Sequence, residues 1–140
     1  MKRKLTKGEI LYPGDKLYSN DELTPDAYLT ITPDGDLQFC EGLGSSIPKT
    51  FFHLKEAEGA TNSSSINSDD PCYLILQEDG NLCIRTKEKF KWANYKFGDS
   101  LTLFANPTGE AAILHKDGEK VLWVFGYPNG FGDFFLKDDA

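Results

Sequence analysis

Residues 72–85 read CYLILQEDGNLCIR, two runs of alternating side chains on either side of an Asp-Gly-Asn turn. Alternation with a period of two is typical of a strand with one buried face, and Asp-Gly is a preferred hairpin turn. We expect Leu76, Leu82 and Ile84 to face a core. The opposite face would carry a polar row, which is a candidate binding surface, formed by Gln77, Asp79, Asn81, Cys83 and Arg85.

Two imperfect copies of this stretch flank it. Residues 27–40 read AYLTITPDGDLQFC and residues 101–114 read LTLFANPTGEAAIL. Units of this size cannot each bury a core, so we expect three of them to pack their inner faces around one axis. The large aromatic side chains that follow the copies are the expected centre of that core, namely Phe51 or Phe52, Trp92 and Trp123.

The composition favours one all-β domain spanning residues 1–140. Aromatic residues make up 13% of the chain, glycine and proline are frequent, and no stretch repeats with a helical period of 3.6. We expect residues 1–8 to be a flexible lead and the Ser- and Asn-rich residues 55–71 to be a mobile loop. The tail, residues 125–140, would supply a final strand to its own domain or to a neighbouring chain.

The charge argues against two classes of partner. A net charge of −7 repels phosphate backbones and anionic lipid, so we expect neither nucleic-acid binding nor membrane insertion. No secretory signal or long apolar segment is recognisable, which favours a cytoplasmic protein or one secreted without a signal in this sequence. Three cysteines cannot all pair within one chain, and a single bridge involving Cys72 stays open.

The sequence carries no motif for catalysis or for a cofactor. Nucleophile, zinc-protease and phosphate-loop patterns are absent, and His53 lies far in sequence from His115. The acidic pair Asp34 and Asp36 would lie on one strand face, whereas glycoside hydrolysis needs opposed carboxylates across a cleft. We therefore expect a non-enzymatic protein with no catalytic residue, no bound metal and no cofactor.

The stretch from Gln77 to Arg85 resembles the motif of the bulb-type (monocot, snowdrop-like) mannose-binding lectin family, Gln-x-Asp-x-Asn-x-Val-x-Tyr. That family repeats the motif three times, each time followed by a buried Trp. Residues 10–17, ILYPGDKL, also resemble the family's opening Leu-x-x-Gly-x-x-Leu, and the resemblance runs from about Glu9 to Trp123. It implies a β-prism II fold of three pseudo-symmetric antiparallel sheets around one aromatic core.

The resemblance also implies roles for individual side chains. The family's Asp and Asn hold the axial 2-hydroxyl of mannose, which places Asp79 and Asn81 there, and its Gln, here Gln77, holds the 3-hydroxyl. Cys83 replaces the Val that touches the sugar ring. Arg85 replaces the Tyr that binds the 4-hydroxyl, and it could reach that hydroxyl, favour an acidic glycan or fold back onto Asp79.

The other two copies match the motif less well. The first would form a weaker carbohydrate site, because Asp36 replaces the motif's Asn and so loses a donor; its members are Thr32, Asp34, Asp36 and Gln38. The third keeps almost none of the motif, with Asn106, Thr108, Glu110, Ala112 and Leu114 at the equivalent positions.

Two functions follow as hypotheses. The first is a carbohydrate-binding lectin for mannose-containing glycans or glycoproteins, which could form a homodimer by exchanging C-terminal strands as the family commonly does. The alternative is a β-prism scaffold that has lost sugar binding and acts as a protein-interaction module. A sugar-binding test on Asn81 variants separates the two.

Overall fold

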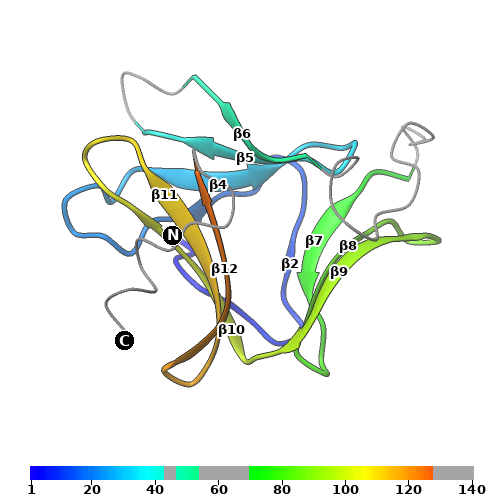
Figure 1. The fold of residues 1–140 in the computed structure, drawn as a ribbon. Helices are drawn as coiled ribbons and strands as arrows, with labels where there is room; N and C mark the ends of the chain where they lie inside the picture. The colour runs from blue at the N-terminus through cyan, green and yellow to red at the C-terminus, as the bar shows by residue number, and fades with distance from the viewer. Residues whose placement is uncertain (43–46, 54–69, 128–140) are drawn as a thin grey trace.

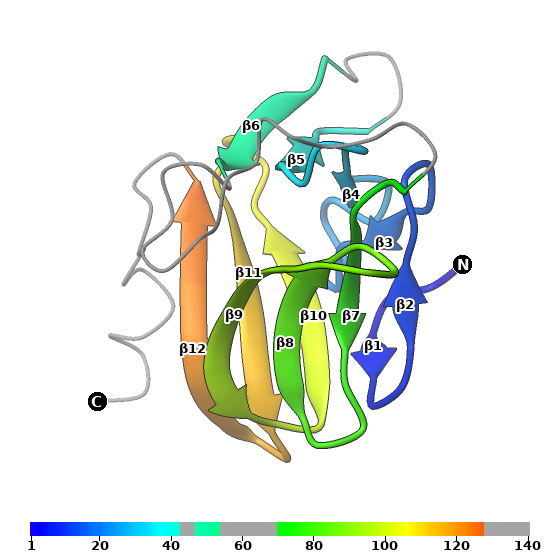
Figure 2. The same cartoon turned by 90° about the vertical axis from the view of Figure 1, so that its right-hand side faces the viewer.

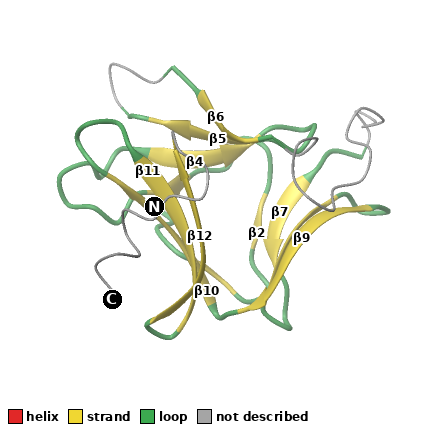
Figure 3. Cartoon of the chain, in the orientation of Figure 1, coloured by secondary structure: helices red, strands yellow, loops and turns green. Residues whose placement is uncertain are grey.

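Twelve short strands and no helix form the part of the computed structural model that is described, residues 1–42, 47–53 and 70–127 (Figure 3). In chain order they are β1 (Leu5–Thr6), β2 (Ile10–Leu11), β3 (Leu17–Tyr18), β4 (Tyr28–Ile31), β5 (Leu37–Cys40), β6 (Lys49–Phe52), β7 (Tyr73–Leu76), β8 (Asn81–Arg85), β9 (Phe90–Phe97), β10 (Ser100–Ala105), β11 (Ala111–Asp117) and β12 (Lys120–Tyr127). They pair antiparallel in three four-stranded sheets. Figure 1 shows the sheets as three sides around a common centre.

Each sequence copy forms one hairpin, followed by a third strand of the same sheet. The hairpins are β4–β5, β7–β8 and β10–β11, and the third strands are β6, β9 and β12. Gly35, Gly80 and Gly109 lie in the hairpin turns with φ of 97°, 92° and 89°, a conformation that favours glycine. The prediction of three antiparallel units in an all-β fold is confirmed.

The inner faces of the three sheets share one hydrophobic core, and aromatic rings lie where the sheets meet. Trp92 contacts the ring of Phe52 at 4.9 Å between centroids and that of Trp123 at 5.6 Å. Phe51 and Phe52 are both buried, although adjacent side chains of a regular strand face opposite ways. The pairing of β5 with β6 shifts register between Leu37 and Gln38.

The segment of residues 1–8, expected to be a flexible lead, contains the strand β1. Together with β2 and β3, which follow residue 8, it gives every sheet one two-residue strand, with β1 beside β10, β2 beside β7 and β3 beside β4. The three strands are drawn in blue in Figure 2. Leu5 pairs with Leu101 and is fully buried. Burial of this leucine and the backbone pairing offset the entropy cost of ordering the segment.

The basic residues at the start of the chain are also held in place. Lys2 forms an ion pair with Glu9 at 2.7 Å between Nζ and Oε2. Arg3 donates through Nη1 to the backbone carbonyls of Ser19, at 2.6 Å, and Pro25, at 3.0 Å. Both cations therefore bind adjoining segments of the chain.

Acidification is expected to loosen β1. The bonds that Glu9 accepts from Lys2 and Thr6 lower the pKa of this carboxyl from its ordinary 4.5 to about 2. A lowered pKa stabilises the fold above about pH 4.5, and this contribution is lost as the pH falls through about 2. Because Glu9 is partly exposed, solvent screening limits it to less than about 1 kcal/mol. A loss of amide-exchange protection at Leu5 in acid, measured relative to the intrinsic exchange rate at the same pH and absent in a Glu9→Gln variant, would confirm this effect.

Parts of two predicted segments lie outside the described residues. Of the loop expected at 55–71, the structure describes Asp70 and Pro71; of the tail expected at 125–140, it describes residues 125–127, which belong to β12. The ring of Tyr127 stacks on that of Phe51, with centroids 6.4 Å apart. No helix in the described ranges is long and apolar enough to span a membrane.

Candidate functional site

The second copy of the motif is built around a tight turn between β7 and β8. Gln77 accepts a backbone hydrogen bond from Gly80 at 2.8 Å and donates one to Asn81 O at 2.9 Å. Gly80 takes the positive φ that closes the turn. Leu82 and Ile84 enter the core, as predicted, so Asn81, Cys83 and Arg85 lie on the opposite face of β8.

Asp79 and Asn81 are oriented by backbone amides. The Asn81 N–H donates to Asp79 Oδ1 at 3.0 Å, and the Tyr95 N–H donates to Asn81 Oδ1 at 3.0 Å. Asp79 thereby keeps Oδ2 as an acceptor, and Asn81 keeps both protons of Nδ2 as donors. A fixed acceptor beside a fixed donor can bind one hydroxyl group that both donates and accepts.

The amide that holds Asn81 comes from a bulge in β9. Cys83 pairs with Ala93, but Asn81 pairs with Phe97, so extra residues of β9 lie between these two pairs. Tyr95 lies in this bulge with φ of 55°, the one positive value among described residues other than glycine. Such strain persists only where neighbouring groups fix it, and here the Asn81 side chain is one of them.

Cys83 occupies the small apolar position of the motif. It lies between Ile75 of β7 and Ala93 of β9 and is only 1% exposed, although the polar row was expected to face solvent. Burial is the main cause that raises the pKa of its thiol to about 11, with the charge of Asp79 adding to the effect. Cys83 therefore stays uncharged at neutral pH and packs as a small apolar side chain within the sheet, so the contact with a sugar ring expected of it is not available. All three cysteines are free and buried, so no bridge involves Cys72.

Arg85 lies at the end of the row, directly opposite Tyr73 in the register. Its Nε donates to Thr86 O at 3.0 Å, and the described residues show no ion pair between Arg85 and Asp79. Of the three orientations considered from sequence, the one that blocks Asp79 is therefore not adopted. Gln77 is half-buried at the other end of the row, and the described structure gives its side chain no hydrogen bond.

In the first copy, the equivalent side chains bind one another. Thr32 Oγ1 donates to Asp34 Oδ1 at 2.6 Å and accepts from the Asp36 N–H at 3.0 Å. Asp36 Oδ2 also lies 3.2 Å from His53 Nδ1. Gln38 lies further along β5, paired with Thr30 and Thr50. Thr32, Asp34 and the Asp36 backbone therefore form hydrogen bonds that stabilise the turn of this copy.

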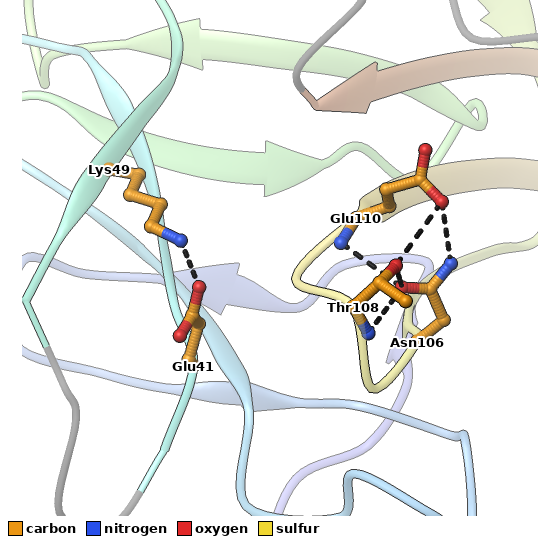
Figure 4. Close-up of polar contacts among 5 residues, drawn as sticks. All are labelled: Glu41, Lys49, Asn106, Thr108 and Glu110. Atoms are coloured by element: carbon orange, nitrogen blue, oxygen red, sulfur yellow. Dashed lines mark hydrogen bonds and ion pairs between the residues drawn. The ribbon is translucent and has the colours of Figure 1, made fainter.

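In the third copy, too, the equivalent side chains form hydrogen bonds with one another (Figure 4). Asn106 Nδ2 donates to Glu110 Oε1 at 2.9 Å, and Thr108 Oγ1 donates to Asn106 Oδ1 at 2.6 Å. The ion pair between Glu41 and Lys49 lies beside this turn. Beyond the turn, the positions equivalent to the polar row of the second copy are apolar in the third copy. Ala112 and Leu114 form a small separate cluster with Val124, and Phe104 and Val121 pack against it.

The three copies lie on three different sheets, so they form separate sites. Nowhere in the described ranges do three histidine, cysteine or acidic side chains gather in a way that could hold a metal. Asn94, Tyr95 and His115 were not predicted as part of the second copy. Their positions in sequence carry no motif, because a bulge and a contact between two sheets bring them to it.

The sequence matches no protein-family model and no curated protein. Among solved structures, it is similar to a monomeric monocot mannose-binding lectin from Gastrodia elata, with 19% identity, 94% of this chain and 99% of that chain covered, and a TM-score of 0.52. A Marasmius oreades lectin matches with 16% identity, 93% and 92% coverage and a TM-score of 0.49. The Gastrodia match shows that this chain has the β-prism fold of a monocot lectin, as the resemblance implied.

Proposed function

We propose that the protein is a non-enzymatic lectin that binds mannose-containing glycans through the second copy of the motif. The observation that carries the proposal is the pair formed by Asp79 and Asn81, whose backbone bonds leave one acceptor and one donor group for a ligand. The mannose-binding lectin from Gastrodia, which shares the fold, supports the choice of sugar.

The chemistry of the pair explains how it would select mannose. A hydroxyl placed between Asp79 Oδ2 and Asn81 Nδ2 donates to the carboxylate and accepts from the amide. An epimer with this hydroxyl in the other orientation would leave both protein groups without a partner, which is the strongest basis for discrimination. Gln77 and Arg85 at the ends of the row would bind the neighbouring hydroxyls, whereas Cys83, at 1% exposed, would not contact the sugar.

Binding at this single site is expected to be weak. A shallow site with a few hydrogen bonds typically gives a dissociation constant near one millimolar, or about −4 kcal/mol. Titration with mannose and with mannobiose, followed by NMR, tests this directly. Chemical-shift changes confined to residues of β7, β8 and the β9 bulge would support the proposed lectin function. No change at tens of millimolar sugar would contradict it.

Arg85→Tyr is expected to strengthen mannose binding about threefold to tenfold. A phenol hydroxyl can donate and accept, whereas a guanidinium only donates, and the new ring would lie opposite Tyr73. Isothermal titration of both proteins with mannobiose measures the change. If the variant binds mannobiose more weakly and sialylated sugar is preferred by the native protein, Arg85 instead selects acidic glycans.

A protein-binding scaffold is the second candidate, and the outer edge of one sheet favours it. β9 is an edge strand that exposes three aromatic side chains, Phe90, Tyr95 and Phe97, at 38%, 64% and 55%. Exposed aromatic residues are enriched in protein interfaces. For such a partner, Phe97→Ala would weaken binding and Asn81→Asp would not, which is the reverse of the pattern expected for sugar.

Self-association would raise the avidity of a weak site. Two sites in one dimer could engage one multivalent glycan and bind far more tightly than either alone. Exchange of C-terminal strands is our proposal for such a dimer, although its segment lies outside the described residues and the Gastrodia lectin is monomeric. A monomer mass at high concentration would contradict it.

A further inference from the structure

His115 is a fully buried polar side chain that lies beneath the proposed sugar site. It belongs to β11 of another sheet, yet its ring lies against the backbone where the Gly80 turn meets the β9–β10 connection. A Cβ added to Gly98 would come within 2.9 Å of His115 Cδ2, and Gly98 N donates to Gly80 O at 3.1 Å. His115 Nε2 is buried and has no hydrogen bond of good geometry among the described residues, although the backbone carbonyls of Gly80 and Gly98 act on the ring.

The hydrogen bond between Asn94 and His115 fixes the form of the imidazole. Asn94 Oδ1 accepts from the Lys96 N–H at 3.0 Å, which orients the amide so that Nδ2 faces His115 Nδ1 at 2.8 Å. An amide nitrogen only donates, so Nδ1 must accept and the neutral ring carries its proton on Nε2. A protonated imidazole would place an N–H against the Asn94 N–H, and this bond would be lost.

Asn94 and Tyr95 are neighbours in the β9 bulge, and this links the histidine to the sugar site. The bond to His115 fixes Asn94, while the next residue, Tyr95, donates its N–H to Asn81 Oδ1. We propose that His115 is a positioning residue, which holds Asn81 through Asn94 and the bulge, and that its protonation weakens carbohydrate binding in acid. This inference rests on the lectin function proposed above.

The groups around the ring are compatible with such a switch. Burial lowers the pKa of His115 below its ordinary value of 6.5, against the smaller opposing effects of the Gly80 and Gly98 carbonyls and of Asp99. The residues paired with it, Leu101 of β10 and Trp123 of β12, carry no charge. Asp99 is therefore the charged side chain that acts on the ring from an element packed against it.

The test is the pH dependence of mannobiose binding between about pH 7.5 and about pH 4.5, because the lowered pKa of His115 places its protonation below the ordinary value of 6.5. We expect the affinity of the native protein to fall about tenfold, as for the loss of one orienting hydrogen bond. His115→Asn, whose Oδ1 can accept from Asn94 without titrating, should bind equally at both values. Asn94→Ala should bind weakly at both, which covers the case that His115→Asn fails to fold.

His53→Asn is the matched control, because it removes the other histidine, beside Asp36 in the first copy. It should keep the native pH dependence. Equal native affinity at both pH values, or the same slope in Asn94→Ala, would overturn the coupling. If no sugar binds at all, the proposed lectin function fails, and the backbone amide resonances of Tyr95 and Asn81 in the free protein then test the coupling. These resonances should shift with pH in the native protein but not in Asn94→Ala. Any other result would overturn the coupling.

Discussion

Gly80→Ala is expected to lower the free energy of unfolding by about 3 kcal/mol or more. Gly80 has φ of 92°, which costs a residue with a side chain about 1–2 kcal/mol. A Cβ here would also lie 2.7 Å from Gly98 O and 3.0 Å from Gly98 N. These are backbone atoms that cannot rotate away, so the β9–β10 connection must move. Chemical denaturation with a linear extrapolation measures the loss.

Gly14→Ala is the matched control for this substitution. Gly14 has the same φ of 92°, but no atom lies within 4 Å of the added Cβ. It should therefore lose only the cost of the backbone conformation, about 1–2 kcal/mol. Equal losses in the two variants would show that the contact between Gly80 and Gly98 is not tight, and the position of His115 beneath the turn would then be in doubt.

Asn81→Asp is expected to reduce mannose binding about a hundredfold, below detection for a millimolar site. The substitution removes the Nδ2 donors and places a second carboxylate beside Asp79, where a hydroxyl can satisfy only one. The fold should survive, because the new Oδ1 can still accept from the Tyr95 N–H. Titration with mannobiose gives the affinity, and a denaturation curve checks the fold.

Asn106→Asp makes the same chemical change in the third copy and serves as the control. Its amide donates to Glu110 within a turn that lies on another sheet. Mannobiose affinity should stay at the native value, whatever stability is lost in that turn. An Asn81→Asp protein that binds as well as Asn106→Asp would show that the second copy is not the sugar site.

The hairpins and the core could be predicted because they depend on local patterns. Alternation places Leu82 and Ile84 inside, and glycine marks the turn at Gly80. The strand β1 was missed because its two residues, Leu5 and Thr6, are too few to show a period. Their pairing is decided by distant partners, as Leu5 with Leu101 illustrates.

The residues of the site could be predicted from the sequence, but their burial and their contacts with distant residues could not. Spacing places Asn81 and Cys83 on one face of β8, yet their burial comes from β7 and β9 on either side. The bulge at Tyr95 and the contact between Asn94 and His115 join residues far apart in sequence. No local pattern contains that information. In the first and third copies, for which weaker or absent sugar binding stays a prediction, side chains form hydrogen bonds within the turns.

The central measurement is an NMR titration of the native protein with mannobiose that follows the side-chain amide of Asn81. Nδ2 is the donor that the structure leaves for a ligand, while Oδ1 is held by Tyr95. We expect the Asn81 amide protons to shift with saturation near one millimolar, together with the backbone amides of residues 77–85. Saturable shifts elsewhere that leave Asn81 unmoved, or no shifts at tens of millimolar, would contradict a sugar site at the second copy.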